Sequence, residues 1–437
     1  MVARALAAVR TFAWGQWLLA IFGLIAFQRL NADTGFPVLE VQLDERNPTD
    51  ANFAWSVPSG AQLTLASPKT DDAQFVSAPR CSSGALMRTS ARSWTVPTGC
   101  GKVIWSAGLP RIEQAKFDAS APISVWSARH RFWVLTNSLP WLRVDGQPGG
   151  TVRVTARVDG QQLVREARLP NDISAPLYIV IGTPVRRYAA PGAGIEIFGD
   201  APLGPRVDQL QRAVVSTLAH WRRDLLPSKR RSDLNFRFVW FQTSAVGAAP
   251  GVQASSGSDA ILIQFTPEAK DDQPYDHLEA GVLLVGMHEA FHSFGGWMPG
   301  RKPAWFNESL ATYFAYEAAR HHLTGRPLAL SDELVKAPAE HSVLHAEQRL
   351  EKGDSSDYGI FYSRGTRFWW AIDRILTIRP NASGKLAALL QQTDGFAGVD
   401  WNDPKSIARF FDGYSGGKAS SVVRCYLVDD ACAAANL

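Results

Sequence analysis

The chain has 437 residues, of which 46% are hydrophobic and 20% charged, and its formal net charge is +4. This composition is that of a globular protein with length for two or three domains, and it excludes a disordered or low-complexity chain. The small net charge, and a densest basic run (residues 229–231) without interleaved aromatic residues, predict no nucleic-acid partner.

The N-terminal segment carries an apolar run over residues 12–27, flanked by Arg10 and Arg29. Its length is slightly below the ~20 residues that span a bilayer, which favours a cleaved export signal. Ala32 offers a cleavage position, but no clean A-x-A precedes it, so an uncleaved anchor stays open. We therefore assign residues 1–32 to a signal peptide or a membrane anchor, and expect a periplasmic or extracellular protein whose only membrane contact would be this anchor.

The cysteines support export. Cys81, Cys100, Cys425 and Cys432 fall into two local pairs, one near each end of the chain. In an exported protein this pattern predicts two disulfides, and the lack of C-x-x-C spacing argues against a cysteine metal site.

Residues 33–190 contain short alternating or β-branched runs between turn residues. These runs are 38–43, 62–66, 103–107, 123–126, 132–136, 151–158 and 177–181. Residues 152–164 form the clearest hairpin, with Asp159-Gly160 suited to a type I′ turn. The pattern predicts an antiparallel β-sandwich domain.

From about residue 190 the pattern becomes mixed, and we assign residues 191–437 to an α+β domain. A helix is expected over 207–226 and strands over 234–241 and 260–265, with a Gly/Ser/Ala-rich loop at 244–258 between the two strands. Further helices are expected around 369–375 and 386–392, after a polar stretch from 332 to 357.

The sequence H-E-x-x-H lies at residues 288–292, inside an apolar run that predicts a buried helix over about 277–294. His288 and His292 are four residues apart and would lie on one helix face, where both could bind one zinc ion. Glu289 is one step round the helix, and its carboxylate could act as general base on a water at the metal.

A second helix is expected to begin near Pro303 and to run to about Leu323. The turn between the two helices is short, so they should pack antiparallel. That packing would bring Glu308 towards His292 as a third ligand and leave a fourth position for water.

These residues resemble the gluzincin pattern H-E-x-x-H…W-x-N-E-x-x-A-x-Y, through Trp305-Phe306-Asn307-Glu308 and the following residues to Tyr313. Aminopeptidase N-like and glycyl-aminopeptidase-like enzymes carry this pattern. The resemblance implies a thermolysin-like domain with a mixed sheet and helices, a zinc cofactor and Glu308 as a ligand. It also implies that Tyr362, in a Y-x-R-G version of the family's Y-x-K-G segment, donates a hydrogen bond to the oxyanion, with Tyr358 as the rival for this role.

The sequence departs from the family pattern at one segment. The strand before the zinc helix shows no G-x-M-E-N-like segment, whose glutamate binds a substrate's free amino terminus in the family, so aminopeptidase specificity is in doubt. A metzincin site is disfavoured because Met298 occupies the position of its third histidine.

The leading hypothesis is an exported zinc metallopeptidase that acts on a peptide or protein substrate. The alternatives are a surface or periplasmic binding protein built on a zinc-peptidase scaffold, and a zinc hydrolase of a non-peptide amide. His341 and His345 are also four residues apart, but they lie in the polar stretch without a neighbouring glutamate motif, and we expect no second metal site there.

Overall fold

The computed structural model describes residues 38–66, 75–112, 122–145, 150–169, 176–200, 205–227, 233–242, 251–257, 259–266, 276–295, 298 and 302–430. The predicted signal or anchor segment lies outside these ranges. Among the described helices, none is both long and apolar enough to cross a bilayer.

The N-terminal half consists of strands. They are β1 (Leu39–Asp44), β2 (Asn47–Trp55), β3 (Gln62–Leu65), β4 (Phe75–Cys81), β5 (Gly84–Ala85), β6 (Met87–Ser90), β7 (Ser93–Thr95), β8 (Val103–Gly108), β9 (Val125–Ser127), β10 (Phe132–Leu135), β11 (Leu142–Val144), β12 (Thr151–Val158), β13 (Gln161–Arg168) and β14 (Ile179–Gly182). Within the described ranges they form a seven-stranded sheet (β13-β12-β1-β2-β8-β4-β5), a four-stranded sheet (β11-β3-β7-β6) and a three-stranded sheet (β14-β10-β9).

The predicted antiparallel pairing is correct for most strand pairs and wrong for one, and the sandwich arrangement stays a prediction. β1 pairs with β12 in parallel, although the other strand pairs of the three sheets are antiparallel. Alternation of side chains shows which face of a strand is buried, but it does not show which strand lies beside it. The predicted hairpin is confirmed: β12 and β13 are joined by Asp159 and Gly160, both with positive φ.

The three-stranded sheet joins the two halves of the molecule. One face, with Trp133 and Ile181, packs into the core of the N-terminal sheets. Its other face, with Phe132 and Val180, packs against Val239 of the next sheet and its neighbours. Both faces are therefore buried, which explains why β10 and β14 are continuous apolar runs.

The second half begins with a five-stranded mixed sheet in the order β15-β16-β17-β19-β18. Its strands are β15 (Arg186–Ala190), β16 (Ala193–Gly199), β17 (Leu234–Gln242), β18 (Gly251–Ser256) and β19 (Ile261–Thr266). β15 already belongs to this sheet, and the domain boundary at residue 190 stays a prediction. The loop expected at 244–258 is wrong in part, because β18 lies within it and forms the sheet edge, antiparallel to β19.

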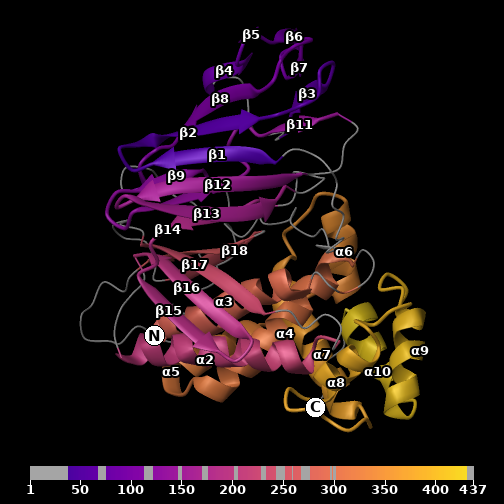
Figure 1. Ribbon diagram of the computed structural model, residues 1–437. Helices are drawn as coiled ribbons and strands as arrows, with labels where there is room; N and C mark the ends of the chain where they lie inside the picture. Colours follow the sequence, from indigo (N-terminus) through magenta and orange to yellow (C-terminus); the bar gives the residue numbers. More distant parts are fainter. Residues whose placement is uncertain are drawn as a thin grey trace, which may run out of the picture.

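Helices cover the face of this sheet away from the N-terminal half (Figure 1). They are α2 (Pro205–Asp224), α3 (Asp276–Gly295), α4 (Ala304–His322), α5 (Gly325–Val335), α6 (Val343–Glu351), α7 (Thr366–Ile375), α8 (Lys385–Gln392), α9 (Pro404–Ser415) and α10 (Ala419–Val423), with π-helical turns η4 (Phe361–Gly365) and η5 (Arg424–Val428). The predicted α2, α3, α4, α7 and α8 are confirmed. Helix α6 lies within the polar stretch at 332–357 and was not predicted, because so short a helix shows little hydrophobic periodicity.

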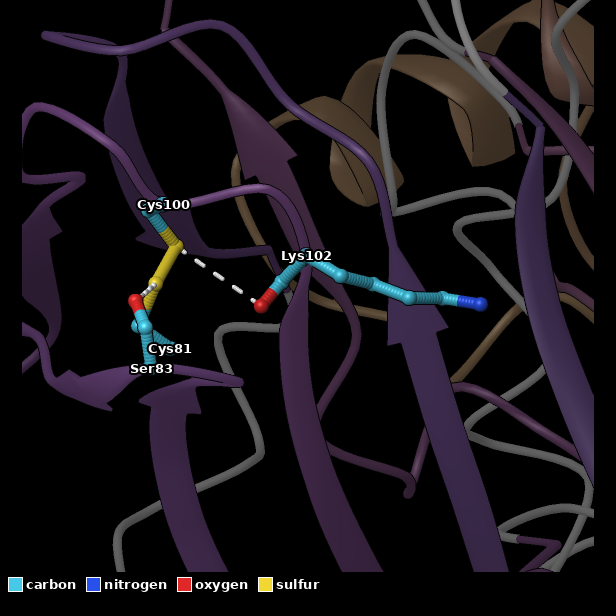
Figure 2. Close-up of a disulfide and its surroundings, with 4 residues drawn as sticks. All are labelled: Cys81, Ser83, Cys100 and Lys102. Carbon is cyan, nitrogen blue, oxygen red and sulfur yellow. Dashed lines mark hydrogen bonds between the residues drawn. A yellow bond between two sulfur atoms is a disulfide. The ribbon is translucent and has the colours of Figure 1, made fainter.

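One of the two predicted disulfides is present in the described residues. Cys81, at the end of β4, is bonded to Cys100, which precedes β8 (Figure 2). The Ser83 hydroxyl lies 3.4 Å from the sulfur of Cys81. Cys425 is also disulfide-bonded, and its predicted partner Cys432 lies outside the described residues.

Candidate metal centre

Helix α3 lies between the edge strand β18 and helix α4. Gly281 faces Val252 on β18 so closely that an added Cβ would overlap the valine side chain. The glycine therefore allows the helix to approach the sheet edge. His288 and Glu289 lie about two turns further along the same helix, and both residues are buried.

The donor atoms of His288, His292 and Glu308 converge, as predicted from the two-helix arrangement. Nε2 of His288 lies 2.9 Å from Nε2 of His292 and 3.2 Å from Oε2 of Glu308. The Glu308 oxygen lies 3.5 Å from Nε2 of His292. Zinc bonds of ~2.0–2.2 Å at tetrahedral angles place donor atoms about 3.3 Å apart, so the three side chains fit a zinc ion.

Thr312, one turn beyond Glu308 on α4, fixes the tautomer of His288. Its hydroxyl donates to the main-chain oxygen of Glu308 at 2.8 Å. The hydroxyl oxygen can then accept a hydrogen bond from Nδ1 of His288, 3.0 Å away. With the proton on Nδ1, the lone pair of Nε2 points to the metal position. The role of Thr312 was not predicted from the sequence, although its i+4 spacing from Glu308 was a usable signal.

Replacing Thr312 with Val should lower zinc affinity by roughly 10–100-fold, because His288 loses the acceptor that orients its ring. Competition with a chromophoric chelator measures the affinity. Thr312→Ser keeps the hydroxyl and should restore it. Equal affinity in the valine variant and the native protein would show that Thr312 does not position the ligand.

Glu308 and His292 stabilise each other's charged forms before any metal binds. Burial alone would raise the pKa of Glu308, but the charges and hydrogen bonds of His292 and His288 lower it well below its usual range. Burial lowers the pKa of His292, and Glu308 raises it by more, so the net shift is upward. Glu308 is therefore ionised at neutral pH and provides the anionic donor that a divalent cation requires.

Tyr178 approaches this centre from the N-terminal half, just before β14. Its hydroxyl lies 3.1 Å from that of Ser255 on β18. Burial raises the pKa of Tyr178, and the charge of nearby Glu289 adds to the rise. The N-terminal half therefore contributes a side chain to the surroundings of Glu289, which no local sequence pattern could have revealed.

Both candidate tyrosines lie beside the cluster of His288, His292 and Glu308. The ring centroids of Tyr362 and His288 are 5.6 Å apart, as are those of Tyr358 and Tyr362. Each phenol is within hydrogen-bonding reach of the Glu308 carboxylate. Tyr358 is only 9% exposed, whereas Tyr362 is partly exposed. The geometry therefore brings together all five side chains predicted from the sequence, together with the rival Tyr358.

The turn η4 that carries Tyr362 is held by the two residues that complete the Y-x-R-G segment. A Cβ added to Gly365 would lie 2.7 Å from Cβ of Ser309 on α4, so glycine allows η4 to lie against the helix of Glu308. The buried Arg364 donates to main-chain oxygens within η5 and just after it, including those of Tyr426 at 3.1 Å and Asp430 at 2.9 Å.

Replacing Gly365 with Ala should lower the free energy of unfolding by about 1–3 kcal/mol, because η4 and α4 must separate to admit the methyl group. Urea denaturation measures the change. Gly413→Ala is the matched control, since a Cβ there meets nothing within 4 Å and the residue lies inside α9. That variant should be neutral or stabilised by up to ~1 kcal/mol. Equal effects of the two substitutions would contradict the close-approach role of Gly365.

The fold is similar to that of a solved aminopeptidase N family protein. The aminopeptidase N family protein from Idiomarina loihiensis matches 90% of this chain and 76% of its own length, with a TM-score of 0.62 and 12% sequence identity. Yeast LTA4 hydrolase, solved in complex with bestatin, matches 90% of this chain and 67% of its own length, with a TM-score of 0.40 and 10% identity. No protein-family model and no curated protein matches the sequence. The second match has too low a TM-score to carry an argument. The first match, at 12% identity, shows similarity of fold alone.

Proposed function

We propose that the protein is a zinc-dependent metallopeptidase of the gluzincin type. The observation that carries this proposal is the convergence of the His288, His292 and Glu308 donor atoms at zinc-like spacing, with Glu289 on the next helix position. A bound zinc ion would supply Lewis acidity that polarises a carbonyl group and lowers the pKa of water. The fold shared with an aminopeptidase N family protein supports the proposal.

The remaining side chains have distinct roles in this proposal. Glu289 takes a proton from the attacking water and passes it to the leaving amine. Tyr362 donates its phenolic hydrogen to the oxygen on which negative charge develops. Thr312 holds His288 in the tautomer that binds a cation, and Tyr178 closes the side of the centre next to Glu289.

The edge strand β18 bears on substrate choice. It lies beside α3 and carries the sequence Gly251-Val-Gln-Ala-Ser-Ser256, which offers no carboxylate to bind a free α-amino group. Among the described residues β18 pairs only with β19, so its other side could pair with an extended peptide. Cleavage must therefore be scored both at amino termini and inside peptides.

Digestion of a peptide library by the native protein tests the proposal. We expect cleavage that a chelator abolishes and added zinc restores. No cleavage of any peptide by zinc-loaded protein would reject a peptidase, and would favour the binding-protein or non-peptide-amide alternative. Cleavage that is insensitive to chelation would reject the zinc mechanism.

We also propose that the protein acts outside the cytoplasm. The disulfide between Cys81 and Cys100 supports this location, because such bonds persist mainly in oxidising compartments. Fractionation of the native host, with the mature N-terminus sequenced, tests the location and shows whether residues 1–32 are cleaved.

A further inference from the structure

A second cluster of side chains that could bind a metal lies at the N-terminal end of α6. His341 precedes the N-cap residue Ser342 of this helix, and His345 lies in its first turn. Asp430 follows η5 near the end of the described chain. Nδ1 of His345 and Nδ1 of His341 lie 3.4 Å and 3.8 Å from the same oxygen, Oδ2 of Asp430.

The two imidazole rings are stacked, with centroids 4.4 Å apart, and the Nδ1 atom of each is the ring nitrogen near the Asp430 carboxylate. Nδ1 of His341 is inaccessible to solvent and has no hydrogen-bond partner among the described residues. A buried nitrogen without a partner requires an explanation, and 3.8 Å is too long for a hydrogen bond. A cation placed between the three donors would satisfy this nitrogen.

The spacing of the donors suits a transition metal. Tetrahedral zinc requires donor atoms about 3.3 Å apart, so the distances of 3.4 Å and 3.8 Å need only a small closure. Two imidazole nitrogens and one carboxylate oxygen favour zinc-class ions over magnesium or calcium, which prefer oxygen ligands. We propose that His341, His345 and Asp430 form a second zinc site, separate from the catalytic centre.

This second site is more open than the first. The side chains of His341, His345 and Asp430 are 32%, 41% and 45% exposed, whereas those of His288, His292 and Glu308 are 10%, 16% and 11% exposed. The ion therefore exchanges with solvent more readily and is bound more weakly. The N-terminus of α6 also disfavours a cation, and the Asp430 carboxylate offsets this cost.

The role of the second site is structural. Oδ1 of Asp430 accepts a hydrogen bond from the main-chain nitrogen of Ser342 at 2.6 Å. Arg364 donates through Nη1 to the main-chain oxygens of both His341 and Asp430, at 3.0 Å and 2.9 Å. The ion would therefore link the segment after η5 to the N-terminal end of α6. Arg364 of η4, the turn that carries Tyr362, binds both of these segments.

Helix α6 also contacts the start of α4. The Glu347 carboxylate accepts hydrogen bonds from the main-chain nitrogens of Ala304 at 3.0 Å and Trp305 at 2.9 Å. These residues begin α4, the helix that carries Glu308 and Thr312. The second site thus supports α4 and η4 together, and its three ligands are positioning residues.

Zinc titration of the full-length protein tests the proposal, with bound metal counted by elemental analysis after gel filtration. We expect two equivalents in the native protein and one in a His341→Ala/His345→Ala variant. A His321→Ala/His322→Ala variant, which loses two exposed histidines at the end of α4, is the matched control and should keep two. A His288→Ala/His292→Ala variant should keep one, so a failure of the second site is distinguishable from a failure of the catalytic site.

Asp430→Asn provides a milder test, because its amide oxygen can still accept from Ser342 while the charged ligand is lost. The Asp430→Asn variant should bind one equivalent of zinc. When Asp430→Asn is combined with His288→Ala/His292→Ala, added zinc should no longer raise the melting temperature. Magnesium should give no such rise in any variant. One equivalent in the native protein at saturating zinc, or two in the His341→Ala/His345→Ala variant, would overturn the proposal.

Discussion

Glu289→Gln should lower kcat by roughly 10²–10⁴-fold, because the amide cannot accept the proton of the attacking water. Zinc content should not change, since Glu289 is not among the three side chains whose donor atoms converge. KM should change little, because glutamine has nearly the same shape as glutamate and leaves the surrounding side chains in place. Steady-state kinetics on a peptide from the library, with elemental analysis of the same sample, measures all three quantities.

The control for this substitution lies on the same helix. Glu279 is also buried on α3, but its carboxylate accepts from Nε of Arg206 at 3.0 Å and has no part in the metal centre. Glu279→Gln should therefore retain kcat even if it lowers stability. A zinc-loaded Glu289→Gln variant with native kcat would reject the general-base role, and loss of zinc from this variant would instead make Glu289 a ligand.

The two helices of the metal centre could be predicted because local physics determines both. The apolar run before His288 and the i,i+4 spacing of its partner His292 fix a helix face, and Pro303 marks the next helix start. A short connection leaves few arrangements other than antiparallel packing. Glu308 was therefore expected at the metal, and its oxygen lies 3.2 Å from Nε2 of His288.

Contacts between segments that are distant in the sequence could not be predicted from such local patterns. The parallel pairing of β1 with β12, and the approach of Tyr178 to Glu289, depend on chain segments that no periodicity connects. The same holds for Asp430, which completes a cluster that His341 and His345 could not indicate alone. The edge strand β18 was missed because its small residues resemble a loop, and the close approach of Val252 to Gly281 is visible only in the structure.

Tyr362→Phe should lower kcat by about 10²–10³-fold, which is the cost of removing one oxyanion donor. Burial, together with the Glu308 charge, raises the pKa of Tyr362 well above 10. The phenol therefore keeps its proton throughout the neutral and moderately alkaline range, and its titration should produce no loss of activity below pH 10. A pH profile of kcat for the native protein measures this directly.

Tyr358→Phe is the matched control, and comparison of the two variants decides between the tyrosines. Both phenols reach Glu308, so either substitution can weaken zinc binding, and both variants must be assayed at equal zinc content. Tyr358 is more buried than Tyr362 and packs on Phe361, with ring centroids 5.1 Å apart. Its hydroxyl is thus less available to a substrate, and its loss should lower kcat by less than about tenfold. A larger loss in Tyr358→Phe than in Tyr362→Phe would assign the oxyanion donor to Tyr358.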